Sequence, residues 1–281
     1  MPNDIFPDGK AKYCCVFFCC LLDIPGADII MKPSSIRLEG YHMLKYEIEG
    51  GNLPVVICYP EAGQTLCTQS GAMSWMSPNM QMQTNSGGGF KKMMGRLFSG
   101  DSVFMNEYTP AGGSGMIAFA SSLPGTIIPY QVTAGHGIIV QKSGFMAMEK
   151  GLELSVHFQR SLGKGLFGGE GFIMQKITGN GLVFIEIDGH CKEYTLQAGE
   201  SIVVDTGYLA AMSESCQLDV LTVKGAKNVL FGGEGLFHTR ITGPGKVYLQ
   251  SMPVINMAQR LVPYIPNGSS GGDGISINLG G

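Results

Sequence analysis

The chain has 281 residues, and its composition excludes several classes of protein before any motif is considered. It contains 42 glycines, 44% hydrophobic residues and only 15% charged residues; this mixture disfavours a mainly helical protein and suits short strands joined by tight turns, because glycine supplies the positive φ angles that such turns need. The formal net charge of −3 gives no overall attraction to nucleic acid or to an anionic membrane, so such a partner would need a local basic patch.

The first forty residues differ from the rest of the chain. Tyr13–Leu22 is an apolar run of ten residues, shorter than the ~20 residues that a membrane-spanning helix needs. Two lysines precede this run, as in a signal peptide, but an acidic residue and a proline follow it in place of a small-residue cleavage site. We therefore expect residues 1–40 to be an extension outside the fold, with the start at Met31 or Met43; a signal peptide or anchor is the alternative.

From Lys45 onward, one pattern of turns and strands occurs three times. Each instance has an Ala-Gly turn, a short apolar strand, a second glycine and then a strand that carries a methionine. The turns begin at Ala62, Ala134 and Ala198, and the later strands contain Met76, Met148 and Met212. This recurrence predicts a repeated unit of roughly 64 to 72 residues.

A second motif follows in the same units. Leu166–Gly181 reads LFGGEGFIMQKITGNG and Leu230–Gly245 reads LFGGEGLFHTRITGPG, with ten of sixteen positions identical. A third, less similar copy begins at Leu97 with the sequence LFSGD. The two motifs divide the chain into three tandem repeats, at about residues 46–116, 117–183 and 184–260.

Within the repeats, short apolar runs separated by glycine predict the strands of an all-β sandwich or barrel. Asp188-Gly189 lies between the apolar runs Leu182–Ile187 and His190–Leu196, which predicts a two-residue hairpin.

Helix is indicated in only two places, Phe90–Leu97 and Val254–Leu261. The tail 267–281 is a flexible Gly/Ser segment with too little apolar surface to order itself. We therefore expect one domain over residues 45–266. An open row of three units would leave two unpaired sheet edges, so we expect the units to close around a pseudo-threefold axis.

A family resemblance rests on the segments EGGNLPVVIC, GRLFSGD, IAFASSLPG, LFGGEGFIMQKITG, VVDTGYLAAM and ITGPG. These are similar to segments of the altered-inheritance-of-mitochondria (mitochondrial biogenesis) family, bacterial branch, and the resemblance covers roughly Lys45 to Pro266. It implies a fold like that of the tryptophan RNA-binding attenuation protein (TRAP-like), built as three β-sandwich repeats. It implies no established catalytic activity for the bacterial members; the fungal mitochondrial relatives are linked to inner-membrane organisation.

Two patterns that serve cofactors or catalysis elsewhere lack their structural context here. Gly163–Gly168 fits the dinucleotide pattern G-x-G-x-x-G, but no helix is indicated after it to bind a pyrophosphate. Gly268–Gly272 fits the nucleophile elbow G-x-S-x-G, but it lies in the Gly/Ser tail. The five histidines show no metal-ligand spacing, and His136 takes the position of Gln64 and Glu200 in the other repeats, which favours a polar turn.

An acidic residue occupies an equivalent position in each LFGGEG-type motif: Asp101, Glu170 and Glu234. We expect each to accept backbone N–H groups from its own glycine-rich turn. The alternative is that a threefold axis gathers the three carboxylates into a site for a hard cation such as Ca²⁺ or Mg²⁺.

Basic residues precede each of these motifs and form a speculative anion-binding set. Pseudo-symmetry could gather them into a ring that binds phosphate or a nucleic-acid backbone with salt-dependent affinity, although lysines before a turn more often form a solvated face. The set consists of Lys91, Lys92, Arg96, Arg160, Lys164, Lys224 and Lys227.

The eight cysteines contain no C-x-x-C pair, so we expect free, mostly buried thiols in a reducing cytosol. The sequence therefore predicts a cytoplasmic, non-enzymatic scaffold or binding protein without a cofactor. Its expected partner is an unknown protein or a second copy, because the related ring-forming fold assembles through sheet edges. The alternatives are a binder of polyanions (RNA, single-stranded DNA or phosphate) and, less favoured, an enzyme whose site forms between repeats.

Overall fold

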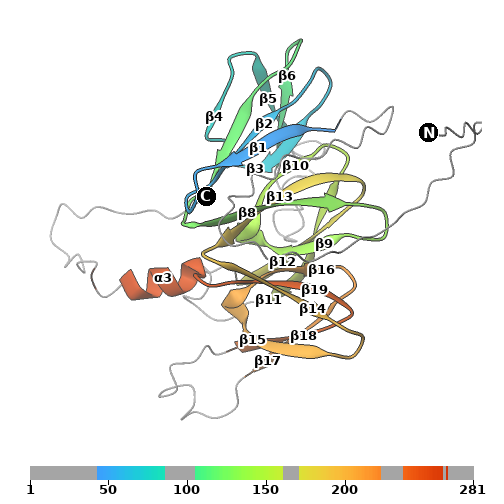
Figure 1. The fold of residues 1–281 in the computed structure, drawn as a ribbon, viewed down its shortest axis with the longest axis vertical. Coiled ribbons are helices and arrows are strands. Elements are labelled where there is room, and N and C mark those ends of the chain that lie inside the picture. The colour runs from blue at the N-terminus through green and yellow to red at the C-terminus, as the bar shows by residue number, and fades with distance from the viewer. Residues whose placement is uncertain (1–42, 86–104, 161–170, 223–236, 262–263, 265–281) are drawn as a thin grey trace, which may run out of the picture. The chain divides into compact units, whose positions relative to one another are not determined.

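The structure is a computed structural model, and it describes residues 43–85, 105–160, 171–222, 237–261 and 264 (Figure 1). The described residues form nineteen strands, two short 3-10 helices and one α-helix. The predicted all-β fold class is therefore confirmed.

The strands form four sheets, in which neighbouring strands are antiparallel. The first sheet has the order β1 (Lys45–Glu49), β2 (Val55–Tyr59), β7 (Ile117–Ala120), β4 (Trp75–Met76). The second has the order β5 (Met80–Asn85), β6 (Met105–Pro110), β3 (Leu66–Gln69), β10 (Phe145–Glu149), β13 (Gly181–Asp188), β8 (Gly125–Val132). The third has the order β11 (Glu153–Arg160), β12 (Phe172–Thr178), β9 (Ile138–Gln141), β16 (Leu209–Ser213), β19 (Gly245–Gln250), β14 (Cys191–Leu196). The fourth has the order β15 (Ser201–Asp205), β18 (Phe237–Thr242), β17 (Gln217–Thr222).

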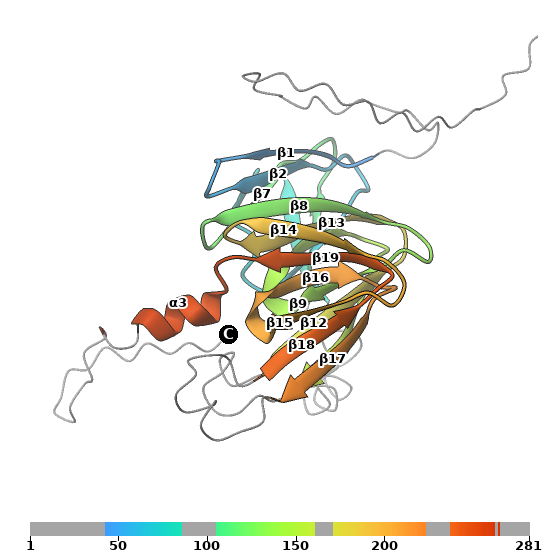
Figure 2. The same cartoon turned by 60° about the horizontal axis from the view of Figure 1, so that its bottom comes forward.

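The two six-stranded sheets follow the same plan. In the second sheet the β3–β10 pairing joins β5-β6-β3 to β10-β13-β8, and in the third the β9–β16 pairing joins β11-β12-β9 to β16-β19-β14. A shift of register interrupts both β10–β13 and β16–β19 near their first residues. Figure 2 shows β14, β19, β16, β9 and β12 following one another across the third sheet.

The first and fourth sheets have fewer strands, and one edge strand of each is relevant to the prediction that the three units close into a ring. Among the described strands, β4 pairs only with β7 and β15 pairs only with β18. In the plan of the two six-stranded sheets, β15 corresponds to β3 and β9, and β4 corresponds to β10 and β16. A closed ring of three units would therefore require an additional pairing between β15 and β4. The three repeats and the pseudo-threefold axis therefore stay predictions.

Buried side chains pack into three clusters between the sheets. Strand β13 contributes to two of them, since Val183 and Ile185 lie in one cluster and Phe184 in another, as the alternation of side chains along a strand requires. The third cluster contains Phe172 and Met174 of β12. Each such fully buried side chain stabilises the fold by about 1.5–3 kcal/mol relative to an exposed one. Burial on both faces explains why β13 reads as a nearly continuous apolar run.

The predicted hairpin at Asp188-Gly189 is wrong, although the strands and the turn are where the sequence placed them. Gly189 has a φ of 76°, but β13 pairs with β10 and β8 in the second sheet, while β14 pairs with β19 in the third. The chain turns and then crosses to another sheet. Partners from distant parts of the sequence therefore replace the local hairpin.

The predicted helix Val254–Leu261 is confirmed and is labelled α3. The Asp188 carboxylate accepts the backbone N–H of Val254 in its first turn, and the Asn256 side-chain amide donates to the Tyr208 hydroxyl at 3.0 Å. Tyr208 ends η3 (Thr206–Tyr208), so both contacts fix the start of α3 to the sheets. Figures 1 and 2 show the rest of α3 directed away from them.

Three further predictions on chain organisation concern residues that the structure does not describe. The extension 1–40, the helix Phe90–Leu97 and the tail 267–281 lie outside the described residues. Within the described ranges, no helix is long and apolar enough to cross a membrane.

Candidate functional site

Arg160 is the one member of the predicted anion-binding set that the structure describes. It is the last residue of β11 and is exposed. Its Nη1 donates to the Val220 carbonyl on β17 at 3.3 Å, and its guanidinium carbon lies 5.7 Å from the centre of the Phe237 ring on β18. A guanidinium has five N–H donors, so these contacts leave donors for an anion.

The same contacts bring the ends of β11, β17 and β18 together. The connection 161–171 leaves β11 at Arg160, and the connection 223–236 enters β18 at Phe237. Because Arg160 contacts Val220 and Phe237, the two connections start from adjoining strand ends. In sequence they carry three predicted basic residues and two predicted carboxylates: Lys164, Lys224, Lys227, Glu170 and Glu234.

Whether the other predicted site residues gather stays a prediction, because they lie outside the described residues. These are Lys91, Lys92, Arg96, Lys164, Lys224 and Lys227 of the basic set, together with Asp101, Glu170 and Glu234. In the part of the chain that the structure does describe, no group of three or more His, Cys, Asp or Glu side chains could hold a metal ion.

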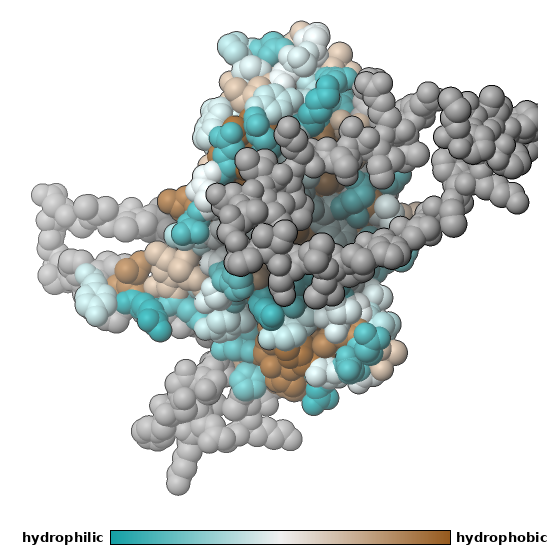
Figure 3. All heavy atoms as spheres, viewed as in Figure 1, coloured by the Kyte–Doolittle hydropathy of each residue, from teal (hydrophilic) through white to brown (hydrophobic). Residues whose placement is uncertain are grey.

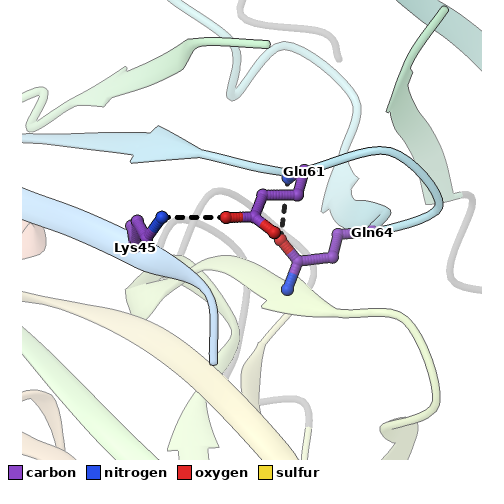
Figure 4. Close-up of polar contacts among 3 residues, drawn as sticks. All are labelled: Lys45, Glu61 and Gln64. Carbon is purple, nitrogen blue, oxygen red and sulfur yellow. Dashed lines mark hydrogen bonds and ion pairs between the residues drawn. The ribbon is translucent and has the colours of Figure 1, made fainter. Parts of the chain in front are cut away.

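The position shared by Gln64, His136 and Glu200 lies in a polar turn, as the sequence predicted. The Oε1 atom of Gln64 accepts the backbone N–H of Glu61 at 2.8 Å, and Glu61 also pairs with Lys45 Nζ at 2.8 Å (Figure 4). The Oε2 atom of Glu200 accepts the backbone N–H three residues earlier at 2.7 Å. In all three turns the backbone N–H at this position donates to the carbonyl three residues earlier, at 3.0, 2.9 and 3.0 Å. The side chains of Gln64 and Glu200 therefore close their turns, and all three turns share the same backbone hydrogen bond.

A cluster of polar side chains around Glu214 was not predicted from the sequence. One carboxylate oxygen of Glu214 lies 2.5 Å from Lys176 Nζ on β12, and the other accepts the backbone N–H of Gly137 at 2.9 Å. The Lys176 hydrogen bond is the main cause that lowers the pKa of Glu214. Burial, followed by the Lys176 charge, lowers the pKa of His157. An ionised carboxylate thus fixes the start of β9; no local pattern could reveal it, because its partners come from different strands.

The four described cysteines are free, and none is suited to nucleophilic attack. Burial raises the pKa of the thiols of Cys58, Cys67, Cys191 and Cys216, in the case of Cys67 to about 11. A reactive cysteine needs the opposite shift, since the thiolate is the nucleophile.

Asp188 is a described carboxyl group whose pKa lies far above its ordinary value. Burial first, and then the charge of Glu186, raise the pKa of Asp188 to about 6, while the hydrogen bond from Val254 N–H opposes the shift. A perturbed pKa often marks a functional site, but here the carboxylate holds the first turn of α3.

Comparisons with known proteins relate the chain to one family. The sequence model described as mitochondrial biogenesis AIM24 matches residues 46–252. An uncharacterized protein of Streptococcus pyogenes serotype M6 is 27% identical over 225 residues, which cover 77% of this chain and 89% of the relative. The crystal structure of a Streptococcus pyogenes protein superposes with a TM-score of 0.66 at 23% identity, covering 79% of this chain and all of that one, which supports the fold alone.

Proposed function

The chain belongs to the mitochondrial biogenesis AIM24 family, and on this premise we propose that it acts as a scaffold or binding protein without catalytic activity. The observation that supports the proposal is that polar side chains of types common in active sites hold the backbone instead. Gln64 and Glu200 close turns, Glu214 fixes a strand start, and Asp188 holds a helix. We place this function in the cytoplasm, in keeping with the four described cysteines, which are free and mostly buried.

A second candidate function is the binding of a polyanion through the basic residues that precede the LFGGEG-type motifs. The geometry around Arg160 favours it, because two of the connections that carry these residues start from adjoining strand ends. The ligand would be the backbone of RNA or of single-stranded DNA, which offers a row of phosphates to a local patch on a protein of net charge −3.

One binding experiment separates the two candidates. Fluorescence anisotropy with labelled RNA and single-stranded DNA would compare the full chain with a variant in which alanine replaces all seven basic residues, at low and physiological salt. A scaffold binds neither probe in either salt. A polyanion binder binds at low salt, loses affinity in the variant, and loses about 0.7 in the slope of log K against log salt for each phosphate contact removed.

The chain supplies a matched control for charge. Lys192→Ala removes one positive charge that lies 5.5 Å from an aromatic ring, as Arg160→Ala does at 5.7 Å. Loss of binding in Arg160→Ala but not in Lys192→Ala supports the polyanion candidate and contradicts the scaffold. Equal loss in both variants contradicts a localised anion site.

A further inference from the structure

Strands β4 and β15 lie at sheet edges, although their counterparts in the six-stranded sheets lie inside those sheets. The order of the second and third sheets places β5 and β11 at an edge, and β17 is the corresponding edge of the fourth. Strands β10 and β16, in contrast, lie inside their sheets because each pairs with a strand of the preceding unit. Strand β4 corresponds to β10 and β16, and β15 corresponds to β3 and β9, yet neither has this partner among the described strands.

The correspondence is fixed residue by residue. Met76 pairs with Ile117 as Met148 pairs with Val183 and as Met212 pairs with Val247. On the facing strand, the Ala-Gly turns align Cys67, Ile139 and Val203. The pairings β3–β10 and β9–β16, which we call the internal joints, use the same register. Met148 faces Cys67 in the first, and Met212 faces Ile139 in the second. Within the described part of the chain, the corresponding residues without such a partner are Met76 and Val203.

Solvent exposure separates the open edges from the closed joints. Val203 is 51% exposed, whereas Ile139 at the corresponding position is fully buried. Trp75 on β4 is 46% exposed, whereas Ala147, at the corresponding position on β10, is fully buried. Figure 3 shows a hydrophobic patch bordered by hydrophilic residues in the region where Figure 1 places β15, β17 and β18. Exposed apolar side chains on an unpaired strand are a pairing site for another chain.

The short length of β4 is consistent with the lack of a second pairing strand beside it. Strands β10 and β16, which pair on both sides, have five residues each, whereas β4 has two. A second partner would supply the hydrogen bonds that extend β4 to the length of its counterparts, as when a peptide adds a strand to a sheet.

We propose that β15 of one copy pairs with β4 of a second copy in the register of the internal joints. Val203 then faces Met76 of the other copy, and Val204 faces Trp75 of the other copy, as Ile139 faces Met212 and Val140 faces Ala211 within the chain. The contact uses different surfaces on the two copies, so it adds copies head to tail until a ring closes or a filament forms. This assembly is independent of the scaffold and polyanion functions proposed above.

Disulfide trapping tests the register in the full chain. The double variant Met76→Cys/Val203→Cys should form covalent dimers and higher species under mild oxidation, because facing residues of an antiparallel pair have Cβ atoms about 4.5–5.5 Å apart. Each single variant and the displaced pair Met76→Cys/Ser201→Cys should form markedly less. Equal yields from the displaced pair would overturn the register. A cross-link within one chain, without an increase in mass, would overturn association in favour of closure.

A charge on the edge tests the association without a cross-link. Val203→Glu should abolish the concentration-dependent increase in mass that sedimentation velocity measures, while the monomer keeps its melting temperature, because the new carboxylate faces Arg240 across the β15–β18 pair. Met82→Glu is the matched control, since Met82 is 52% exposed on β5, a strand whose edge position needs no missing partner. Wild-type protein that is monomeric at all concentrations, or equal loss of association in both variants, would refute the proposal.

Discussion

Burial of Asp188 disfavours its ionised form, whereas the hydrogen bond from the first turn of α3 favours it. The pKa of Asp188 is raised to about 6 from an ordinary value of 3.8, so the folded protein takes up this proton before the unfolded chain does. The contribution of Asp188 to the free energy of unfolding therefore increases as pH falls from about 6 toward 3.8, and the ionised group is a cost above pH 6.

Asp188→Asn removes that cost and keeps an oxygen to accept the Val254 N–H. We expect the variant to melt at a higher temperature than the wild type at pH 7.5, and this gain to shrink between pH 6 and pH 4. Thermal melts across this range give the measurement. Glu153→Gln, at an exposed carboxyl on β11, is the control for the removal of one negative charge. A gain that grows on acidification would show that Asp188 is stabilised as an anion.

On the scale of the element, the turn between β13 and β14 combines two requirements on one glycine. Gly189 has a φ of 76°, and a Cβ atom there would lie 2.5 Å from Ser251 Oγ and 2.9 Å from Met252 Cβ. Gly199 has a similar φ of 83° with no atom within 4 Å of its Cβ position. The two sites therefore separate backbone strain from close packing.

We expect Gly199→Ala to cost about 1–2 kcal/mol, the strain of a left-handed conformation with a side chain. Gly189→Ala should cost clearly more, because the segment after β19 must also move away. Urea unfolding of both variants measures the difference. Equal costs would mean that Ser251 and Met252 yield freely and that only the backbone conformation matters.

The limits of sequence interpretation are also found at this scale. Alternation and glycine spacing located β13 and β14, and the Val254–Leu261 pattern located α3, because these signals are local. The choice of partners is not local: β13 pairs with β8 and β10, and Glu214 meets Lys176 from another strand. The same holds for the candidate site, where Arg160 was found from its position before a motif but its contact with Phe237 was not foreseen.

Across the whole molecule, the sheets are shared by different parts of the chain. The β3–β10 and β9–β16 ladders run through the joints, and the three buried clusters lie between the sheets. In a linear array of weakly coupled units, loss of packing at one end leaves the other end folded. Shared sheets predict the opposite, a single cooperative transition.

The only tryptophan, Trp75 on β4, makes this testable. Met174→Ala empties part of the third cluster, far along the sheet order from the first sheet, and should cost about 2–5 kcal/mol because Met174 is fully buried. If the ladders couple the sheets, the Trp75 fluorescence transition moves to lower temperature by the same amount as the far-ultraviolet circular dichroism transition. Leu261→Ala, at an exposed position on α3, should move neither. A fluorescence transition that stays in place while the circular dichroism transition splits would show that the first sheet unfolds on its own.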